Sequence, residues 1–586
     1  MNAFLKIVLL LCVTLGVSAE VLPLPTHKIH FEGVKHFSKK RLEEALSVEN
    51  KSFFQFWKTE NPRIKDKLIP SLQETVKSFY RSEGFYDMTF TTDKNSTDIT
   101  LKMNENLPVR IHTITIESDY NLSKMIRQEK NDIFRANAFI VAKNSMIEAL
   151  LKEGYCSYDL DTKAYINLTS HQVDLHYILK KGDICHFGKL TLLGLKSIDD
   201  DVVISRVRAL EGKRFSTDLV QETSNALYGL KSFDSVLINV DRKFYNVIPV
   251  EIQFVEIAKA YHFEAGAGYD TYVGPRVHTQ LSKYNFMGDA QQVHLNASWS
   301  KKEQLLTLGY FRPTVIHLLG YSIDFGAEVG YANLEFDGFQ EEKQFTKGYL
   351  EYQNAKLDLK VGMAMENIKI DAIDNLGKLG KLAQAVNEGV FLLAYPYVDF
   401  TYDARDSKLN PKYGYYISAY GELGLSRDED SSVYIKTLFE GRAIYTFAHL
   451  TLATVGKVGI VDQESRQGLP ESKLFFAGGS YSNRAYGYQD IGVIHSSTED
   501  TIFGASSFVN LSFEANYPLY DNVYGAVFTD NTLLNEEAFD FSGTIISSVG
   551  VGVRYMTPIG PFKLDVGFNV DDPSIYAISF QIGQSF

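Results

Sequence analysis

The sequence predicts small α+β modules, repeated three times, followed by a large antiparallel β-barrel of about 16 strands. Three observations support this prediction. At 586 residues the chain is too long for a single hydrophobic core. Its composition, with 35 Tyr, 39 Phe and 42 Gly but only 15 Pro, is typical of many strands joined by turns. The hydrophobic pattern also changes near residue 261, from helical spacing mixed with strands to strict alternation.

The N-terminus has the pattern of a secretory signal peptide. Lys6 precedes an apolar run over residues 7–17, and "VSA" (17–19) fits a small-residue cleavage site. The alternative is a first transmembrane helix, but a run of about 11 residues is shorter than the roughly 20 that span a bilayer. We therefore expect residues 1–19 to be removed on export. No later apolar stretch is long enough for a transmembrane helix, whereas transmembrane strands remain possible.

Charge and motif content exclude several classes of function. The net charge of −13 offers no basic face for nucleic acid. The sequence has no P-loop, HExxH or G-x-S-x-G spacing, so we expect no enzyme, no cofactor and no metal centre. Two cysteines remain after the signal, Cys156 and Cys185. They could pair in an exported protein or stay as two buried thiols, and the sequence leaves both alternatives open.

Residues 28–257 have the pattern of three degenerate β-α-α-β-β copies of about 75 residues each. Helices of the first two copies end at Gly84 and Gly154, each preceded by Glu and followed by an aromatic residue. The third copy has Lys231 or Ser232 at this place. Three unrelated α/β stretches would not be expected to share this order of elements. The predicted modules are residues 27–106, 107–183 and 184–258.

From Tyr261 onward, apolar residues alternate with small or charged ones. A water-soluble sandwich also alternates, but charged residues on the polar face of long strands are typical of a barrel with a wet lumen. These charged residues are Glu514, Arg554, Lys563 and Asp565. At roughly 20 residues per strand and connection, this part holds about 16 strands, and about 14 or 18 fit equally well. We expect residues 259–586 to form a transmembrane antiparallel β-barrel.

One stretch among the predicted strands, "LFFAGGSYSNRAYGYQDIG" (474–492), does not alternate. From its residues alone, its Arg484 is either an exposed loop cation or a charge folded into the lumen against a carboxylate. The stretch resembles the sixth extracellular loop of the outer-membrane assembly-factor superfamily, whose periplasmic modules are called POTRA domains. That loop carries an Arg-Gly-aromatic motif after Phe-Phe-x-Gly-Gly and tucks into the barrel. The matching residues are Gly478, Gly479, Arg484, Ala485 and Tyr486. Ala485 stands where the family has Gly, and Asn483 where it has the preceding Val.

Two C-terminal stretches extend the resemblance. "VYGAVFTDN" (523–531) is similar to the family's strand that ends in Phe-x-Asp, and "VRYMTPIGPFKLDVG" (553–567) to its penultimate strand. The resemblance implies that Arg484 and Asp530 form a buried ion pair that anchors the loop. It also implies a seam between the first and last strands that opens. The residues that it places at this seam are Tyr261, Phe263, Gly583 and Phe586.

Gly583 lies within the last predicted strand, where glycine weakens pairing between strands. The alternative is that it is only a small residue lining the lumen. The open edge that the family's seam provides would template an incoming strand by exchanging main-chain hydrogen bonds.

The family resemblance implies an outer-membrane location, with the modules in the periplasm. It further implies a role in inserting or exporting outer-membrane β-barrel clients, such as autotransporter-like proteins. The implied partners are unfolded clients, outer-membrane lipid and an inner-membrane-anchored protein reached through the first module, with no nucleic acid. The alternative is a passive outer-membrane transporter or a two-partner secretion pore for a polypeptide.

Overall fold

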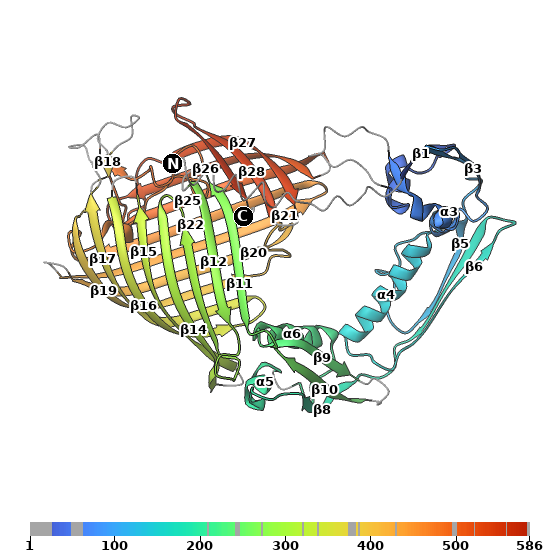
Figure 1. Ribbon diagram of the computed structural model, residues 1–586, viewed down its shortest axis with the longest axis horizontal. Coiled ribbons are helices and arrows are strands. Elements are labelled where there is room, and N and C mark those ends of the chain that lie inside the picture. The colour runs from blue at the N-terminus through green and yellow to red at the C-terminus, as the bar shows by residue number, and fades with distance from the viewer. Residues whose placement is uncertain are drawn as a thin grey trace. The chain divides into compact units, whose positions relative to one another are not determined.

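The computed structural model contains two compact units (Figure 1). No described helix is long and apolar enough to cross a membrane. The predicted signal peptide, residues 1–19, lies outside the described residues, as do Gly583 and Phe586. The described residues are 26–48, 62–207, 210–240, 246–270, 274–318, 321–336, 339–372, 383–384, 387–427, 431–494, 501–520, 522–557 and 560–582.

The first module is a four-stranded sheet packed against helices. Its strands lie in the order β2-β1-β4-β3, with β1 parallel to β4. Leu72, Val76 and Tyr80 of α3 lie about one helical turn apart and are buried in its core, so the helix has one apolar face. The elements are β1 (Thr26–Glu32), α2 (Lys39–Ala45), β2 (Arg63–Lys65), η2 (Asp66–Leu68), α3 (Ile69–Ser82), β3 (Thr89–Lys94) and β4 (Asp98–Asn104).

The second module has a three-stranded sheet in the order β5-β7-β6 and one long helix. The described residues 119–135, where the repeat predicts a first helix, form turns and a bridge instead. Cys156 and Cys185 are both buried and do not form a disulfide with each other. The elements are β5 (Arg110–Ser118), α4 (Ala136–Lys152), β6 (Asp159–Asn167) and β7 (Gln172–Lys180).

The third module has both helices of the repeat and a sheet in the order β8-β10-β9. Strand β10 pairs antiparallel with β9, with Ile252 opposite Ile238. The elements are β8 (His186–Leu193), α5 (Asp200–Val207), α6 (Thr217–Gly229), β9 (Phe233–Val240) and β10 (Val247–Glu256).

The joints between successive modules use the same main-chain contacts. At the first joint, Gly84 has a φ of 94°, and a Cβ there would lie 2.4 Å from the carbonyl oxygen of Phe134. At the second, Gly154 has a φ of 85°, and its Cβ would lie 2.7 Å from the carbonyl oxygen of Phe215. Both positions therefore need glycine, for conformation and for space. Lys231, at the equivalent place in the third copy, also has a positive φ, 52°.

A second repeated feature of the first and third modules is a carboxylate that binds main-chain N–H groups. The carboxylate of Glu105 accepts hydrogen bonds from the main-chain N–H groups of Lys35 and His36. Glu256 accepts equivalent bonds from Lys196 and Ser197, at 2.6 and 2.9 Å. A carboxylate that binds two main-chain N–H groups fixes the turn after the first strand. The shared contact identifies these two modules as copies of one unit.

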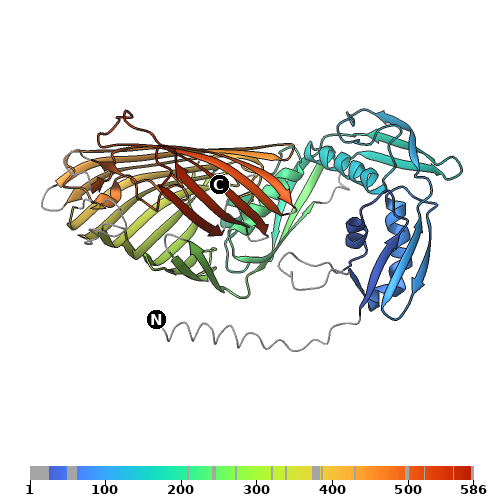
Figure 2. The ribbon, with the colours of Figure 1, turned by 90° about the horizontal axis from the view of Figure 1, so that it is seen from above.

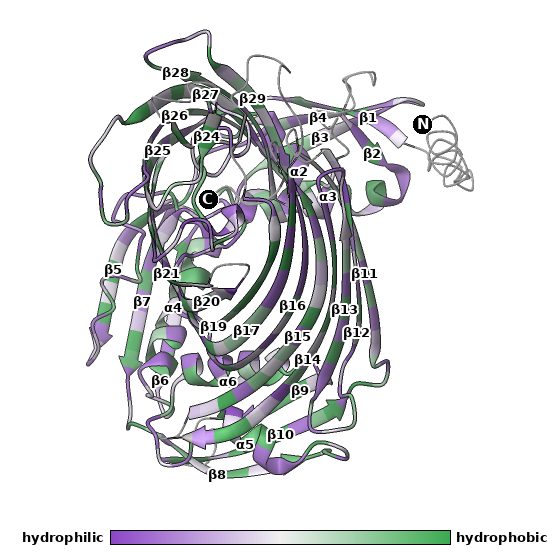
Figure 3. Ribbon diagram, turned by 90° about the vertical axis from the view of Figure 1, so that its left-hand side faces the viewer, coloured by the Kyte–Doolittle hydropathy of each residue, from purple (hydrophilic) through white to green (hydrophobic). Residues whose placement is uncertain are grey.

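The remainder of the chain forms a 16-stranded antiparallel sheet that curves around a lumen (Figures 1–3). Its strands follow chain order, and the long connection between β22 and β25 carries the short strands β23 (Val493–Ile494) and β24 (Thr501–Phe503). The sixteen strands are β11 (Tyr261–Asp270), β12 (Gly274–Lys283), β13 (Gln292–Trp299), β14 (Glu303–Leu318), β15 (Tyr321–Glu335), β16 (Phe339–Gln353), β17 (Leu357–Ala372), β19 (Gly389–Asp403), β20 (Tyr413–Arg427), β21 (Ser431–Phe447), β22 (Leu450–Gln463), β25 (Ser507–Tyr520), β26 (Val523–Asn535), β27 (Ile546–Thr557), β28 (Gly560–Asn569) and β29 (Tyr576–Ile582).

The two faces of the sheet are the reverse of those in a water-soluble protein. Val549, Val551 and Val553 on β27 are 49%, 57% and 46% exposed, whereas Arg554 beside them and Asp565 on β28 are 1% and 4% exposed. Figure 3 shows hydrophobic and hydrophilic residues alternating along the strands. Apolar side chains outward and charges inward are the pattern of a membrane barrel, so the sandwich alternative does not apply.

Strands β11 and β29 lie at the two ends of the sheet order. Within the described residues, no ladder of hydrogen bonds joins them, so the sheet is not closed there. Tyr261 and Phe263 on β11 point outward and are 65% and 69% exposed. The described structure therefore has an unpaired strand edge where the sequence predicts the seam.

Candidate functional site

The connection between β22 and β25 lies inside the barrel and contains the predicted motif. Its turn at Gly478 and Gly479 requires glycine, because the φ values are 108° and 91° and a Cβ on Gly478 would lie 2.2 Å from the carbonyl oxygen of Gly487. The main-chain N–H of Gly479 donates to the carbonyl oxygens of Asn483 and Tyr486, at 3.1 Å each. These bonds fold residues 478–487 into a compact hairpin-like loop that presents Arg484.

Arg484 is 7% exposed and points at carboxylates on the barrel wall. Its Nε and Nη2 each donate to one oxygen of Asp530 at 2.9 Å, and its main-chain N–H donates to Asp530 Oδ2 at 3.0 Å. Its Nη1 donates to Glu514 Oε2 at 2.6 Å. Planar bidentate pairing of this kind is specific to arginine, because lysine cannot make two parallel bonds. The buried-charge alternative for Arg484 therefore describes its position, and the exposed-cation alternative does not.

Further charges extend this contact along the wall. Arg554 donates to Asp565 at 2.5 Å and to Glu514 at 3.1 Å, so Glu514 bridges the two arginines. With Lys563, the cluster contains three cations and three carboxylates, and every member is 8% exposed or less. Buried ions are stable only when their charges and hydrogen bonds are matched, and here the formal charges balance. We name this set the Arg484 network: Arg484, Glu514, Asp530, Arg554, Lys563 and Asp565.

The strands leave space for the loop backbone at the network. The Arg484 guanidinium stacks on Phe528 of β26, with its carbon 3.5 Å from the ring centroid. A Cβ on Gly567 of β28 would lie 2.5 Å from the carbonyl oxygen of Arg484. Glycine at that position therefore allows the loop to lie directly against the wall.

The residues at which the motif departs from the family are well accommodated. Ala485 is fully buried, and it is not among the described residues with a positive φ, so its backbone does not require glycine. Asn483 is also fully buried, and its side chain donates to the carbonyl oxygen of Ile546 at 3.1 Å. The Tyr486 hydroxyl accepts a hydrogen bond from Asn569 at 2.7 Å. The loop therefore contacts the wall through Asn483 and Tyr486 as well as through Arg484.

The alternating pattern predicted Glu514, Arg554, Lys563 and Asp565 on the polar face, but it gave no sign that they contact the loop. Phe528 lies two residues before Asp530 in the Phe-x-Asp stretch, and this adjacency was the available signal for its contact. A cavity of about 60 Å³ adjoins the network, large enough for water. Among the described residues no group of His, Cys, Asp and Glu side chains could hold a metal ion.

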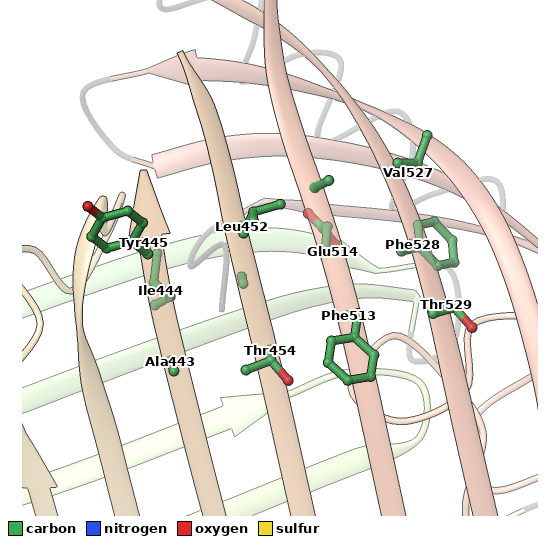
Figure 4. A pocket seen from close by; sticks show the side chains of 12 residues that line it. Ala443, Ile444, Tyr445, Leu452, Thr454, Phe513, Glu514, Val527, Phe528 and Thr529 are labelled. Atoms are coloured by element: carbon green, nitrogen blue, oxygen red, sulfur yellow. The ribbon is translucent and has the colours of Figure 1, made fainter. Parts of the chain in front are cut away.

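A larger recess, about 600 Å³, lies between strands β21, β22, β25 and β26 (Figure 4). Its lining includes the large side chains of Tyr445, Leu452 and Phe513 and the small ones of Ala443 and Ala515. The lining is mostly apolar, and its most exposed side chains, Tyr445 and Val527, lie on the outward face of the barrel. It offers little to orient a polar ligand, in contrast with the Arg484 network on the inner face.

Comparison with known proteins assigns a family to this architecture. Residues 285–586, more than half of the chain, match the Omp85 superfamily domain. The outer membrane protein assembly factor BamA of Nitratidesulfovibrio vulgaris is 20% identical over 575 residues, which cover 93% of this chain and 70% of the relative. The protein of the same name from Neisseria meningitidis serogroup B is 21% identical, with 95% and 78% covered.

The solved structure of BamA from Haemophilus ducreyi lacking POTRA domains 1–3 has the same fold. Its TM-score is 0.54 at 17% identity, over 81% of this chain and 99% of that one. The modules, the 16-stranded sheet and the family match agree: this chain is a BamA-like member of the Omp85 superfamily.

Proposed function

We propose that this protein is an outer-membrane assembly factor that inserts β-barrel clients into the membrane. The observation that carries the proposal is the unpaired edge of β11 beside β29, because a free strand edge can pair with an incoming strand. Two BamA relatives that align with more than nine-tenths of the chain bear the name of assembly factor, which supports the same role. We place the barrel in the outer membrane and the modules in the periplasm, and we assign the chain no enzymatic activity.

In this mechanism the seam residues Tyr261, Phe263, Gly583 and Phe586 form the gate. A client strand pairs with the β11 edge and exchanges its main-chain hydrogen bonds with water for bonds with the sheet. Gly583 weakens the pairing of the last strand and eases opening. The Arg484 network then holds the C-terminal strands to the loop while the seam is open.

The packing of the lumen favours assembly over the passive pore. Loop residues Leu469, Leu474, Phe475 and Ile491 are buried in one apolar cluster with inward-facing residues of β16 to β21. A loop packed against the inner wall in this way narrows the lumen. We accordingly expect a small conductance at rest, whereas a polypeptide pore or porin would conduct steadily.

We further propose that the protein is TamA-like. Its three modules resemble that member of the superfamily, and a TamB-like inner-membrane partner would bind through the first module. The autotransporter-like clients belong to this proposal. Purification of the tagged full-length chain tests the partner: a large inner-membrane protein should copurify with it, and loss of residues 27–106 should abolish the copurification.

The main test is depletion of the protein, followed by comparison of outer-membrane protein content. We expect barrel proteins to fall and periplasmic precursors to accumulate. Purified protein in phospholipid vesicles should also speed the insertion of an unfolded barrel client, measured as the fraction that migrates as folded on an unheated gel. An unchanged outer membrane, together with large steady single-channel conductance, would favour the passive pore.

A further inference from the structure

Lys473 forms a second buried ionic contact within the same loop. It ends the short 3-10 helix η3 (Glu471–Lys473), just before the stretch that resembles the family motif, and it is 8% exposed. Its Nζ lies 3.1 Å from Glu366 Oε2 and 3.1 Å from Glu422 Oε1. Both carboxylates are buried, at 5% and 3% exposed, so Lys473 lies between two charges that would otherwise repel each other.

The surrounding side chains orient this contact. The Lys473 ammonium lies 4.4 Å from the centroid of the Tyr395 ring, and the Tyr395 hydroxyl donates to Glu366 at 2.7 Å. The Tyr420 hydroxyl donates to Glu422 at 2.5 Å. From β21, Lys436 Nζ donates to the main-chain carbonyl of Lys473 at 2.7 Å, so the loop backbone is bound as well as its side chain. A surface lysine would have none of these buried partners.

The two ionic contacts lie on different sectors of the barrel. Lys473 contacts strands β17, β19, β20 and β21, and Arg484 contacts β25, β26 and, through Asp565 at 3.8 Å, β28. Between them the loop also packs Phe475 against Phe508 of β25, with centroids 5.5 Å apart and the rings nearly parallel. Segment 473–484 of the loop is therefore bound at one end to β17–β21 and at the other end to β25, β26 and β28.

We propose that Lys473 is a second positioning residue for the loop, and that it braces β17–β21 to the strands held by Arg484. The Arg484 network alone fixes one end of segment 473–484, and Lys473 fixes the other. The proposal deepens the assembly function proposed above, because a braced wall lets the seam open without the C-terminal strands parting from their neighbours. Glu366 and Glu422 are part of the same contact and have no role in the loop motif itself.

The test measures whether the loop stays packed when Lys473 is changed. A single cysteine replaces Ala477, which lies between the two contacts and is 1% exposed, in a chain with Cys12→Ala, Cys156→Ala and Cys185→Ala. The full chain in phospholipid vesicles is treated with a membrane-impermeant maleimide. We expect Lys473→Met to raise the labelling rate at least about tenfold over the parent, because each loop opening exposes the thiol. Lys473→Arg should restore protection, since it keeps the positive charge.

Two controls separate this effect from general damage. Lys369→Met removes a lysine of similar ion pairing on β17, but that pair is half exposed, so labelling should stay at the parent rate. Folded migration on an unheated gel shows that each variant has its barrel. A parent-like labelling rate in folded Lys473→Met would overturn the proposal, as would equal labelling in Lys473→Met and Lys473→Arg. No client is present, so a failure of the assembly function leaves this result unaffected.

Discussion

Replacement of Arg484 by methionine removes the charge at the centre of the network while retaining most of the side-chain volume. Asp530 then loses two side-chain bonds but keeps the main-chain N–H of residue 484, and Glu514 keeps Arg554. Removing one partner of a buried ion pair lowers the free energy of unfolding by about 3–5 kcal/mol. Because Asp530 and Glu514 keep other partners, we expect a loss of about 3 kcal/mol here. Arg484→Lys preserves the charge but not the bidentate geometry, and it should cost about 2 kcal/mol.

The assay is urea unfolding of the full chain in phospholipid vesicles, with the folded fraction read from migration on unheated gels. The free energies of unfolding of Arg484→Met, Asp530→Asn and the double variant form a double-mutant cycle. Because the two side chains share two hydrogen bonds, their coupling free energy should be about 2 kcal/mol or more. The anchoring role of the pair would be refuted if the two changes were additive, or if Arg484→Met lowered the free energy of unfolding by less than about 1 kcal/mol.

Three further predictions follow from the geometry. Gly567→Val should displace the loop and lower the free energy of unfolding in the same assay, because its Cβ would lie 2.5 Å from the Arg484 carbonyl oxygen; Gly441→Ala, with nothing within 4 Å of its Cβ, should have little effect. Gly583→Val should leave a folded barrel that no longer inserts a client in vesicles, and normal insertion would rule out the gating role. For Glu256, burial raises the pKa, but hydrogen bonds from Ser197 and neighbouring N–H groups outweigh it and hold the pKa below its usual value. The ionised carboxylate therefore stabilises the third module above the unfolded-state pKa, and this contribution is lost as the pH falls through the folded pKa. Glu256→Gln should remove this pH dependence from the hydrogen-exchange protection of residues 194–198, and unchanged dependence would contradict it.

Alternation predicted which side chains face inward, because the period of a strand is two whatever its neighbours. Glu514, Arg554 and Asp565 lie on the buried face for this reason. Which charge meets which could not be predicted, since that depends on the register of neighbouring strands, and a shift of one residue changes every pair. The contact of Lys473 could not be predicted either, because Glu366 and Glu422 lie far from it in sequence and meet it only once the sheet curves around the loop.

Local sequence signals predicted structure correctly where neighbouring residues alone determine it. The helix ends at Gly84 and Gly154 followed from their glycines, and both residues have positive φ values. The segment 119–135 shows the limit of repeat reasoning, because copies of a module can replace a helix with turns when the core is filled in another way. Leu122 and Phe134 from this segment are buried in the second core, so the turns still supply apolar side chains to it.

The identical joints of the first two modules have a consequence for how such a chain can lengthen. At each joint, the glycine carbonyl accepts one main-chain bond from a residue of the next module, and the carbonyl of that residue accepts one from within its own module. Val109 donates to Gly84 and accepts from Phe134, and Cys185 donates to Gly154 and accepts from Phe215. Because these bonds join main-chain groups, they can form whatever side chains the joint carries, so duplication of a module needs little redesign at these contacts. Side-chain ion pairs cross the joints as well, such as Glu83 with Arg135 and Lys152 with Asp218. The third copy, with Lys231 in place of glycine, is instead fitted to one position. Variation in module number should therefore arise at the N-terminal end of the array.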